Sequence, residues 1–578
     1  MIQSACGLDC YDACSIVSDN GKLKGGEDSF TNGALCSVLN KYMSEGNRIT
    51  TPMVDGKEVS MEEALDEVAK VLDSDSLLYR GSGNMGVMQE VTNLLFKQLN
   101  ATIANESLCD GAGNAGIQEG RGGANRVLTP EHIGKAQVVV VWGRNIDTTN
   151  SHLMPYLEGK KLVVIDPIAT AIAKRADIHL QIRPRSDLYL ALLLSRFAMM
   201  QDMQADCDLA DVEDLYDFSR GFRIKLLMKH IGVSADDIAK VLELLAHEKV
   251  VHLVGVGVQK YSIGDAVLRA IDSLAVLLGH YGIDGCGVSY LGDSKLGFDN
   301  PFSVKTKNVS RVDAPFGEFK SVVIQGANPA HSMPNTNAVI EELETVENLI
   351  YFGTYHNESS KMARIVIPAL SFLEKSDVRL SYSDYTIKPM NPIECISMHQ
   401  VDGISEYSFT QAIFKRLGFE GLKDEMEYIN HYLDQAINGL SPEAQNMLEF
   451  DEFEFIEEVD DAFENIKNLT NIKRGKKVVE ENNFWLLTPK AKHSINSQFK
   501  RSDAIEIHSS HGYSEGDNIT ITSEYGSLSG VVKINDDIRQ DCIVVRANVN
   551  GVNALTPPII SNEGNSACYQ EVKVEIER

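Results

Sequence analysis

Four cysteines near the start of the chain have the spacing of a metal-binding loop. Cys6, Cys10 and Cys14 lie within nine residues, and Cys36 follows after 21 intervening residues. Four thiolates brought together in this way can hold either a [4Fe-4S] cluster or a structural zinc ion. Zinc sites favour pairs of cysteines separated by two residues, and this segment has no such pair. The spacing therefore favours an iron–sulfur cluster, with zinc or four unliganded cysteines as the alternatives.

A fifth cysteine, Cys109, lies in a glycine-rich stretch that runs from residue 107 to residue 123. A thiolate in such a loop is a candidate reactive group or metal ligand. A lone cysteine is also common as a small buried hydrophobic residue. The residues around Cys109 leave both interpretations open.

A short glycine loop follows the strand predicted at residues 77–79 and precedes a helix predicted at residues 89–99. A strand, a glycine loop and a helix in this order offer backbone N–H groups to a phosphate, although a tight turn gives the same pattern. The candidate cofactor-binding residues of this loop are Gly81, Ser82, Gly83 and Asn84.

The elements that must position these residues are buried strands that alternate with helices. Strand-to-loop runs at residues 138–145, 161–167, 250–257, 321–329 and 364–368 predict a doubly wound α/β fold. Polar or small residues follow several of these strands, where a large nucleotide-bearing cofactor could lie across the strand ends. They are Gly143, Asn145, Asp166, Gly255, Gly257 and Asn328.

The pattern changes to short, evenly spaced strands after Phe484. Runs at residues 484–488, 504–508, 518–522, 530–534 and 542–545 predict a separate β-barrel of about 95 residues. Before it, residues 443–464 hold ten acidic residues and no basic one. We interpret that stretch as a solvated connector, with a partner-docking surface as the alternative.

The composition limits what the chain can bind. It has 54 Lys and Arg residues against 82 Asp and Glu, for a net charge of -28. Phosphate-backbone binding needs a basic surface, so nucleic acid is excluded as a partner, and so is an anionic membrane surface. Apolar runs such as Val138–Trp142 are too short to span a bilayer, and no export leader is recognisable. We therefore expect a cytoplasmic protein without membrane insertion.

These patterns together predict a multidomain α/β protein. We expect a small iron–sulfur domain at residues 1–50, and a connector and a barrel at residues 431–480 and 481–578. We expect a discontinuous α/β domain at residues 51–135 and 325–430. The remaining α/β domain, at residues 136–324, would bind a cofactor.

The chain resembles the molybdopterin-dinucleotide oxidoreductase family, which includes dimethyl sulfoxide reductase, nitrate reductase and formate dehydrogenase. The four clustered cysteines are similar to the cubane-cluster motif of that family. Further similar segments follow in family order almost to the end of the chain. They are Tyr79–Asn84, Val141–Asn145, Val164–Pro167, Ala327–Pro329, Val366–Pro368, Phe372–Lys375, Ser497–Phe499, Glu515–Asp517 and Asn553–Thr556.

The resemblance implies that two pyranopterin guanine dinucleotides hold one molybdenum or tungsten ion. Cys109 falls where the family places its protein ligand to that metal, and a soft thiolate suits a metal already bound by sulfur. Asp166, Asp187 and Asn145 would line the groove for the guanine ends, because carboxylates accept from the adjacent N–H groups of guanine. Asn328 and Asn553 would face pterin or pyrophosphate atoms.

The sequence departs from the family at two positions near these centres. Val38 stands where the family has a lysine two residues after its fourth cluster cysteine, and Lys41 is the nearest lysine. Asp110 follows Cys109, where the formate enzymes carry a histidine. We expect electron relay through Lys41 or without any lysine, and we expect formate to be a poor substrate.

The resemblance implies a molybdenum- or tungsten-dependent oxidoreductase that performs two-electron redox chemistry, including oxygen-atom transfer, on a small substrate. A [4Fe-4S] cluster would pass the electrons singly to or from a redox partner protein. One alternative is a non-catalytic electron-transfer or scaffold subunit that has lost its pterins. Another is a hydratase on the same scaffold, with no net redox change.

Overall fold

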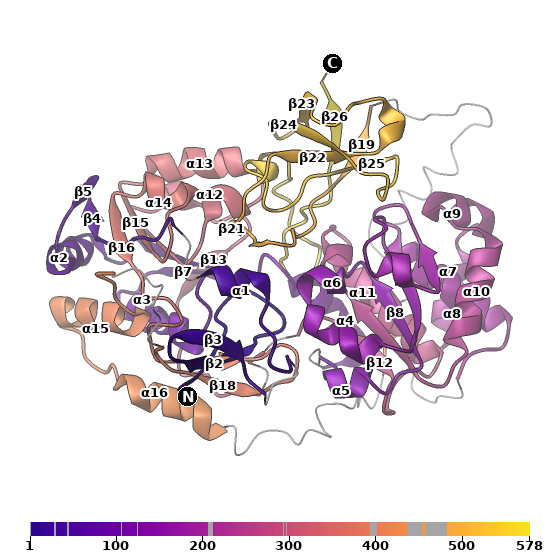
Figure 1. Ribbon diagram of the computed structural model, residues 1–578, viewed down its shortest axis with the longest axis horizontal. Helices are drawn as coiled ribbons and strands as arrows, with labels where there is room; N and C mark the ends of the chain where they lie inside the picture. Colours follow the sequence, from indigo (N-terminus) through magenta and orange to yellow (C-terminus); the bar gives the residue numbers. More distant parts are fainter. Residues whose placement is uncertain are drawn as a thin grey trace. The chain divides into compact units, whose positions relative to one another are not determined.

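The structure is a computed structural model whose described residues fall into two compact units (Figure 1). Unit 1 comprises residues 1–106, 294–439 and 490–502, and unit 2 comprises residues 107–293, 440–489 and 503–578. The described residues are 2–27, 31–42, 46–105, 107–123, 125, 127–205, 212–292, 294–295, 297–393, 401–435, 453–456 and 482–577.

Unit 1 begins with a three-stranded antiparallel sheet that frames the cysteine loop. Its strands are β1 (Ile2–Ala5), β2 (Ser15–Asp19) and β3 (Lys22–Gly25). Two further antiparallel ribbons belong to this unit. They are β17 (Asp377–Leu380) with β18 (Ile387–Met390), and β20 (Ser494–Ile495) with β21 (Gln498–Phe499).

The main sheet of unit 1 has a mostly parallel arrangement, with an antiparallel hairpin at one edge. In spatial order its strands are β13 (Lys307–Ser310), β7 (Thr102–Asn105), β6 (Ser76–Arg80), β14 (Ser321–Gln325), β15 (Asn348–Gly353), β16 (Ile365–Pro368), β4 (Met53–Val54) and β5 (Lys57–Glu58). All five residues of β6 and of β14 are buried, because helices cover both faces.

Two helical layers make the cores on either side of that sheet. One core takes in α2 (Met61–Val71), α3 (Thr92–Gln98) and α15 (Glu406–Leu417), and the other takes in α12 (Pro329–Ser332) and α13 (Thr336–Thr345). Ser60 caps α2, its hydroxyl accepting from the Glu63 N–H at 3.2 Å. The other helices described in this unit are α1 (Ser37–Tyr42), η1 (Val87–Glu90), η5 (Phe316–Glu318), α14 (Glu358–Met362) and α16 (Glu425–Gln435).

Unit 2 contains a parallel five-stranded sheet. In spatial order its strands are β10 (Ile178–Leu180), β9 (Lys161–Ile165), β8 (Val138–Trp142), β11 (Val250–Val254) and β12 (Gly287–Ser289). The core beside it is formed largely by α7 (Asp187–Met200) and α11 (Gly264–Leu277), whose side chains are nearly all buried. The helix after Cys109, α4 (Gly111–Arg121), packs against α11 (Figure 1).

Shorter helices complete the layers of unit 2. They are α5 (Pro130–Ile133), α6 (Ile146–Thr149), η2 (Ser151–Leu157), η3 (Ala173–Arg175), α8 (Val212–Arg220), α9 (Ile224–Ile231), α10 (Ala235–Leu245) and η4 (Val256–Gln259).

The C-terminal strands of unit 2, yellow in Figure 1, close into a barrel. Their order is β19 (Phe484–Leu487), β25 (Cys542–Val544), β22 (Ala504–Ile507), β24 (Ser527–Ile534), β23 (Asn518–Thr522) and β26 (Lys573–Ile576). Two single turns, η6 (Ser509–His511) and η7 (Val552–Ala554), lie between strands. The sequence predicts five of these strands and misses β26, which pairs with both β19 and β23 and so closes the barrel.

The predicted fold class is confirmed: a small N-terminal sheet, two α/β sheets covered by helices, and a C-terminal barrel. The predicted helix at 89–99 is split into η1 and α3 around Val91. The limits predicted for five domains stay a prediction. Most of the predicted connector at 431–480 lies outside the described residues, as does the side chain of Lys41.

Among the helices that the structure describes, none combines the length and the apolar character needed to cross a membrane.

Candidate functional site

The four clustered cysteines lie in unit 1, three of them in the loop between β1 and β2. The Cys6 N–H donates to the Cys14 carbonyl at 2.8 Å, which closes this loop, and the Leu39 N–H donates to the Cys36 sulfur at 3.4 Å. None of these four cysteines forms a disulfide. Burial raises the pKa of Cys10, and the charges of Cys6 and Cys36 raise it further, so these thiols lie within electrostatic reach of one another.

Burial also raises the pKa of Cys6 to about 12. In the described part of the chain, no three His, Cys, Asp or Glu side chains are arranged to hold one metal ion. A cubane cluster places its four thiolates on four different irons, so its ligands need not converge on a single point. The cluster at these four cysteines stays a prediction.

The glycine loop Gly81–Asn84 lies directly beside the turn that follows β14. The Gly81 and Gly83 N–H groups donate to the Gln325 and Gly326 carbonyls, each at 2.9 Å. A Cβ at Gly81 would lie 2.7 Å from the Ala327 Cβ, so the two turns pack at a distance that only glycine permits. Both N–H groups are therefore engaged within the protein, and cofactor binding by this loop stays a prediction.

The same loop is hydrogen-bonded to the cysteine loop. The Met85 N–H donates to the Gly7 carbonyl at 2.7 Å, and the Ser82 hydroxyl donates to Asp9 at 2.9 Å. The two loops that the sequence singles out in unit 1 are thus neighbours in the fold.

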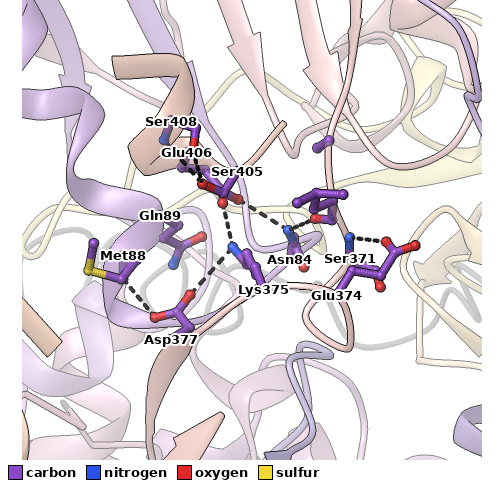
Figure 2. A network of polar contacts seen from close by, with 12 residues as sticks. Asn84, Met88, Gln89, Ser371, Glu374, Lys375, Asp377, Ser405, Glu406 and Ser408 are labelled. Atoms are coloured by element: carbon purple, nitrogen blue, oxygen red, sulfur yellow. Dashed lines mark hydrogen bonds and ion pairs between the residues drawn. The ribbon is translucent and has the colours of Figure 1, made fainter. Parts of the chain in front are cut away.

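Beneath the glycine loop lies a buried ionic network that the sequence does not reveal (Figure 2). Lys375 lies between two carboxylates: its Nζ donates to Glu406 and lies 3.3 Å from Asp377 Oδ2. The Asn84 amide donates to Glu406 at 3.1 Å and to the Leu370 carbonyl at 2.9 Å. A Cβ at Gly86 would lie 2.1 Å from Asp377 Oδ2, so the Asp377 carboxylate packs directly against the backbone at Gly86.

The charges in this network balance one another in part. Burial lowers the pKa of Lys375, but the carboxylates of Glu406 and Asp377 outweigh burial, so the net shift of the Lys375 pKa is upward. The ammonium group is therefore held in its charged form. Asn84 Oδ1 is buried and accepts no hydrogen bond, so it is the polar atom of this side chain that a ligand could still use.

Asn328, predicted to face the cofactor, is engaged on both of its polar atoms. Its amide donates to Glu358 at 2.7 Å, and its Oδ1 accepts from the Ser359 N–H at 3.2 Å and the Ser359 hydroxyl at 3.0 Å. These bonds fix the start of α14 against α12. Its role at a cofactor stays a prediction.

Cys109 lies in unit 2, two residues before the start of α4, and side-chain hydrogen bonds fix the backbone around it. The Cys109 N–H donates to the Ser107 hydroxyl at 3.0 Å, and the Gln259 amide donates to the Cys109 carbonyl. The Gln259 side chain also accepts from the Gly113 N–H at 3.0 Å. Lys260 donates to the Leu108 carbonyl.

Helix α4, which follows this loop, is anchored at both of its ends. Arg121 forms a bidentate ion pair with Asp272 of α11 at 2.6 and 2.5 Å, and both side chains are buried. At the other end, a Cβ at Gly111 would lie 1.9 Å from the Gly564 carbonyl. Sequence reasoning singles out Cys109, whose role as a metal ligand stays a prediction, but it does not single out Gln259, for which the only signal is its place after the glycines that follow β11.

Three of the predicted nucleotide-binding residues gather at the strand ends of unit 2. Asp166 follows β9, Asp187 opens α7, and Asn145 follows β8. Burial raises the pKa of Asp166 to about 7 and that of Asp187 to about 7, and the Asp166 charge further raises the pKa of Asp187. The two carboxylates therefore lie within electrostatic reach of each other.

Backbone N–H groups donate to these acids, but no cation is paired with them among the described residues. Asp166 accepts one hydrogen bond, from the Ile168 N–H at 2.8 Å. Within the described residues neither Asp166 nor Asp187 has a cation at ion-pair distance, and the buried Asn145 Oδ1 accepts no hydrogen bond. Uncompensated buried acceptors are what a ligand rich in N–H donors would use.

The glycines predicted at these strand ends bring the strands together. The Gly255 N–H donates to the Trp142 carbonyl at 2.7 Å, and a Cβ at Gly255 would lie 2.1 Å from the Gly143 carbonyl. Gly143 has a φ of +54°, which also favours glycine. At Gly257 a Cβ would make only ordinary contact, so packing does not require glycine there. Asn553 lies in η7 and is buried.

Comparison with known proteins adds the family. A family model described as molybdopterin oxidoreductase matches residues 48–390. The probable oxidoreductase YyaE of Bacillus subtilis is 26% identical over 552 residues, which cover 86% of this chain and 78% of that protein. The probable oxidoreductase YoaE of the same organism is 22% identical and covers 100% of this chain and 98% of its own.

A solved structure shares the fold along the whole chain. Acetylene hydratase from Pelobacter acetylenicus matches with a TM-score of 0.77 and 14% sequence identity, and the match covers 100% of both chains. At that identity the likeness shows the fold alone. Because the family model spans more than half of the 578 residues, the chain belongs to the molybdopterin oxidoreductase family and is an enzyme of that family.

Proposed function

We propose that this enzyme performs two-electron redox chemistry, including oxygen-atom transfer, on a small substrate at a molybdenum or tungsten ion. The ion would be held by two pyranopterin guanine dinucleotides, and electrons would pass through a [4Fe-4S] cluster. The observation that carries the proposal is the pair Asp166 and Asp187, two buried carboxylates within electrostatic reach of each other that have no cation at ion-pair distance among the described residues. Such a pair is costly in an empty protein and suited to a ligand with several N–H donors.

A guanine base fits these acceptors by its chemistry. Its N1–H and exocyclic amine are adjacent donors, and one carboxylate can accept from both. The free Asn145 Oδ1 adds a further acceptor at the same strand ends. Asp166 and Asp187 would bind and orient the base, with no part in bond making.

The metal would be held by Cys109. When bound, the metal–pterin group supplies the two-electron redox step. Gln259 bridges the Cys109 carbonyl and the Gly113 N–H, so it fixes the thiol-bearing turn at the start of α4. Lys260 holds the preceding carbonyl of Leu108. A positioned thiolate of this kind suits a soft metal site.

Cys6, Cys10, Cys14 and Cys36 would hold the cluster, which would exchange single electrons with a redox partner protein. The direct hydrogen bonds between the cysteine loop and the glycine loop, at Gly7 and Asp9, offer a short covalent and hydrogen-bonded route between them. None of the eight described cysteines forms a disulfide, which supports a reducing compartment such as the cytoplasm.

The direct test is anaerobic purification of the full chain, followed by metal analysis, pterin fluorescence and assay of released guanine. We expect molybdenum or tungsten, iron, pterin and guanine together. Iron without pterin would favour the scaffold alternative, and zinc in place of iron would refute the cluster. A chain loaded with the metal and pterin that hydrates its substrate without any electron acceptor would favour a hydratase.

The role of Cys109 is tested by Cys109→Ala, with Cys286→Ala as the matched control. Cys286 is a buried thiol of the same unit whose sulfur donates to the Glu248 carbonyl at 3.2 Å. We expect Cys109→Ala to abolish turnover with artificial electron carriers and to leave the iron spectrum intact. Full activity of Cys109→Ala would exclude Cys109 as the metal ligand. Brisk formate oxidation by the unaltered chain would contradict the expectation drawn from Asp110.

A further inference from the structure

A two-stranded ribbon in unit 1 carries two buried cations to the cysteine loop. The ribbon pairs β17 with β18, and in its register Arg379 lies directly opposite Lys388. Their exposed fractions are 3% and 6%. Lys and Arg are rarely buried this completely unless their charge meets an opposite one.

Both cations donate to backbone carbonyls of that loop. Arg379 Nη2 donates to the Cys10 carbonyl at 3.4 Å, and Lys388 Nζ donates to the Ala13 carbonyl at 3.0 Å. The first carbonyl belongs to Cys10, and the second belongs to Ala13, the residue before Cys14. The ribbon therefore directs its positive charge toward the segment that carries three of the four clustered thiols.

The protein does not fully neutralise these charges. Within the described residues Arg379 has no carboxylate at ion-pair distance, and its buried Nε has no hydrogen-bond partner. Its guanidinium carbon lies 5.4 Å from the centre of the Tyr382 ring. Lys388 has Asp384 at 3.9 Å, and the buried Asp12 adds a negative charge near the cysteines.

An iron–sulfur cluster bound by four thiolates is negatively charged, and reduction adds one more negative charge. Buried positive charge nearby favours the reduced form, because low-dielectric surroundings screen it little. The net charge around a cluster is one of the properties that set its reduction potential.

We propose that Arg379 and Lys388 are positioning residues that raise the reduction potential of the cluster at Cys6, Cys10, Cys14 and Cys36. This inference rests on the proposed function, which places a cluster there. Val38 occupies the position where the family resemblance expects a lysine, and the ribbon supplies buried positive charge from a different part of the chain.

The test is an EPR-monitored redox titration of the full chain, purified anaerobically, with iron content measured in parallel. We expect Arg379→Gln to make the cluster harder to reduce, by on the order of tenfold in the reduction equilibrium, which is about 59 mV for one electron. Lys388→Gln should shift the potential in the same direction. Arg379→Lys, which keeps the charge, should restore most of the unaltered potential.

Lys24→Gln is the matched control, because Lys24 is an exposed cation on β3 of the small sheet beside the same loop. Solvent screens its charge, so we expect no shift. An unchanged potential in Arg379→Gln with full iron content would overturn the inference. If Arg379→Gln loses its iron but Arg379→Lys retains it, the result supports a need for positive charge at this position. Loss of iron from both variants would overturn the inference.

The two proposals fail in different ways. Absence of any iron–sulfur spectrum in the unaltered chain removes the cluster of the proposed function, and the role of the ribbon with it. A normal cluster whose potential ignores Arg379 and Lys388 removes only the inference about the ribbon.

Discussion

Each unit contains a pair of buried carboxylates, and the two pairs differ in whether a cation is paired with them. In unit 1, Asp377 and Glu406 share the ammonium group of Lys375. In unit 2, Asp166 and Asp187 lie within electrostatic reach of each other, and within the described residues neither has a cation at ion-pair distance.

The difference indicates what each pair is for. A buried carboxylate costs free energy unless a cation or several donors meet it, so the pair in unit 1 has its cation within the protein, although burial still raises the pKa of Asp377. It can fix the glycine loop above it, through Asn84 and Gly86, without any ligand. The pair in unit 2 is incomplete and gains most from a ligand that brings donors.

Removal of the shared cation, Lys375, should have the largest effect on stability and tests this comparison most directly. We expect Lys375→Met to lower the free energy of unfolding by about 3–5 kcal/mol, because it leaves two buried carboxylates without a partner. Chemical denaturation of the full chain at neutral pH measures this change.

Lys70→Met is the matched control, since Lys70 pairs with Glu67 on the exposed face of α2. We expect no measurable change in its stability, because solvent already screens the exposed pair. If Lys375→Met were as stable as the control, the two carboxylates would not depend on Lys375 and the contrast between the units would disappear.

Much of the fold can be predicted from the sequence because its signals are local. The strand at Val138–Trp142 is an uninterrupted apolar run ended by Gly143, and both features are visible without a structure. The four cysteines are also a local signal. Strand β26 is missed because its alternating pattern is only four residues long and carries charged residues, Lys573 and Glu575, at its exposed positions.

The networks of the candidate site are not local and could not be predicted in the same way. The Gln259 side chain reaches Cys109 across 150 positions, and Asn84 reaches Glu406 across 322. Such pairs depend on how strands are ordered in a sheet, which no single segment encodes. The sequence predicts a phosphate site at Gly81 and Gly83, which stays a prediction, but it does not show that their N–H groups donate to the Gln325 and Gly326 carbonyls.

The second prediction sharpens the comparison, because the incomplete pair should respond with the opposite sign. Asp187→Asn should stabilise the ligand-free chain, since it removes an uncompensated buried charge. The unfolded pKa of Asp is near 3.8 and the folded pKa of Asp187 is about 7. Its stabilising contribution is therefore complete below pH 3.8 and is lost as the pH rises to about 7. The gain from the Asn variant should grow across this window, by at most about 1.4 kcal/mol per pH unit.

The same variant should bind guanine more weakly. We expect the Kd of the ligand-free chain for GMP to rise by roughly 10- to 100-fold, the range for hydrogen bonds to a charged acceptor. Glu243→Gln, which removes an exposed charge of α10, is the control and should change neither quantity. Lower stability together with unchanged GMP affinity would show that Asp187 is a structural acid, as Asp377 is.

The third prediction concerns a neutral buried network in unit 2, and its expected effect is the smallest. The Trp142 N–H faces His252 Nδ1 at 3.3 Å, His252 Nε2 faces His280 Nδ1 at 3.2 Å, and His280 Nε2 faces the Leu245 carbonyl at 3.0 Å. With one proton on each ring, every donor in this chain has an acceptor. Burial lowers the pKa of His280 to about 4, and burial with the charge of His280 lowers that of His252.

Because the unfolded pKa of His is near 6.5, the stability that His280 contributes is present above pH 6.5 and is lost as the pH falls toward 4. This is the reverse of the slope expected from Asp187, over an overlapping range of pH, so the two must be separated by variants. His280→Gln keeps a donor and an acceptor but cannot be protonated. Relative to the unaltered chain, its stability should improve between pH 6.5 and pH 5 by about 1 kcal/mol, measured as the change in slope of unfolding free energy against pH. If the unfolding free energies of the variant and the unaltered chain change in parallel with pH, protonation of His280 does not lower stability. The loss of stability of unit 2 at low pH would then come from its carboxylates alone.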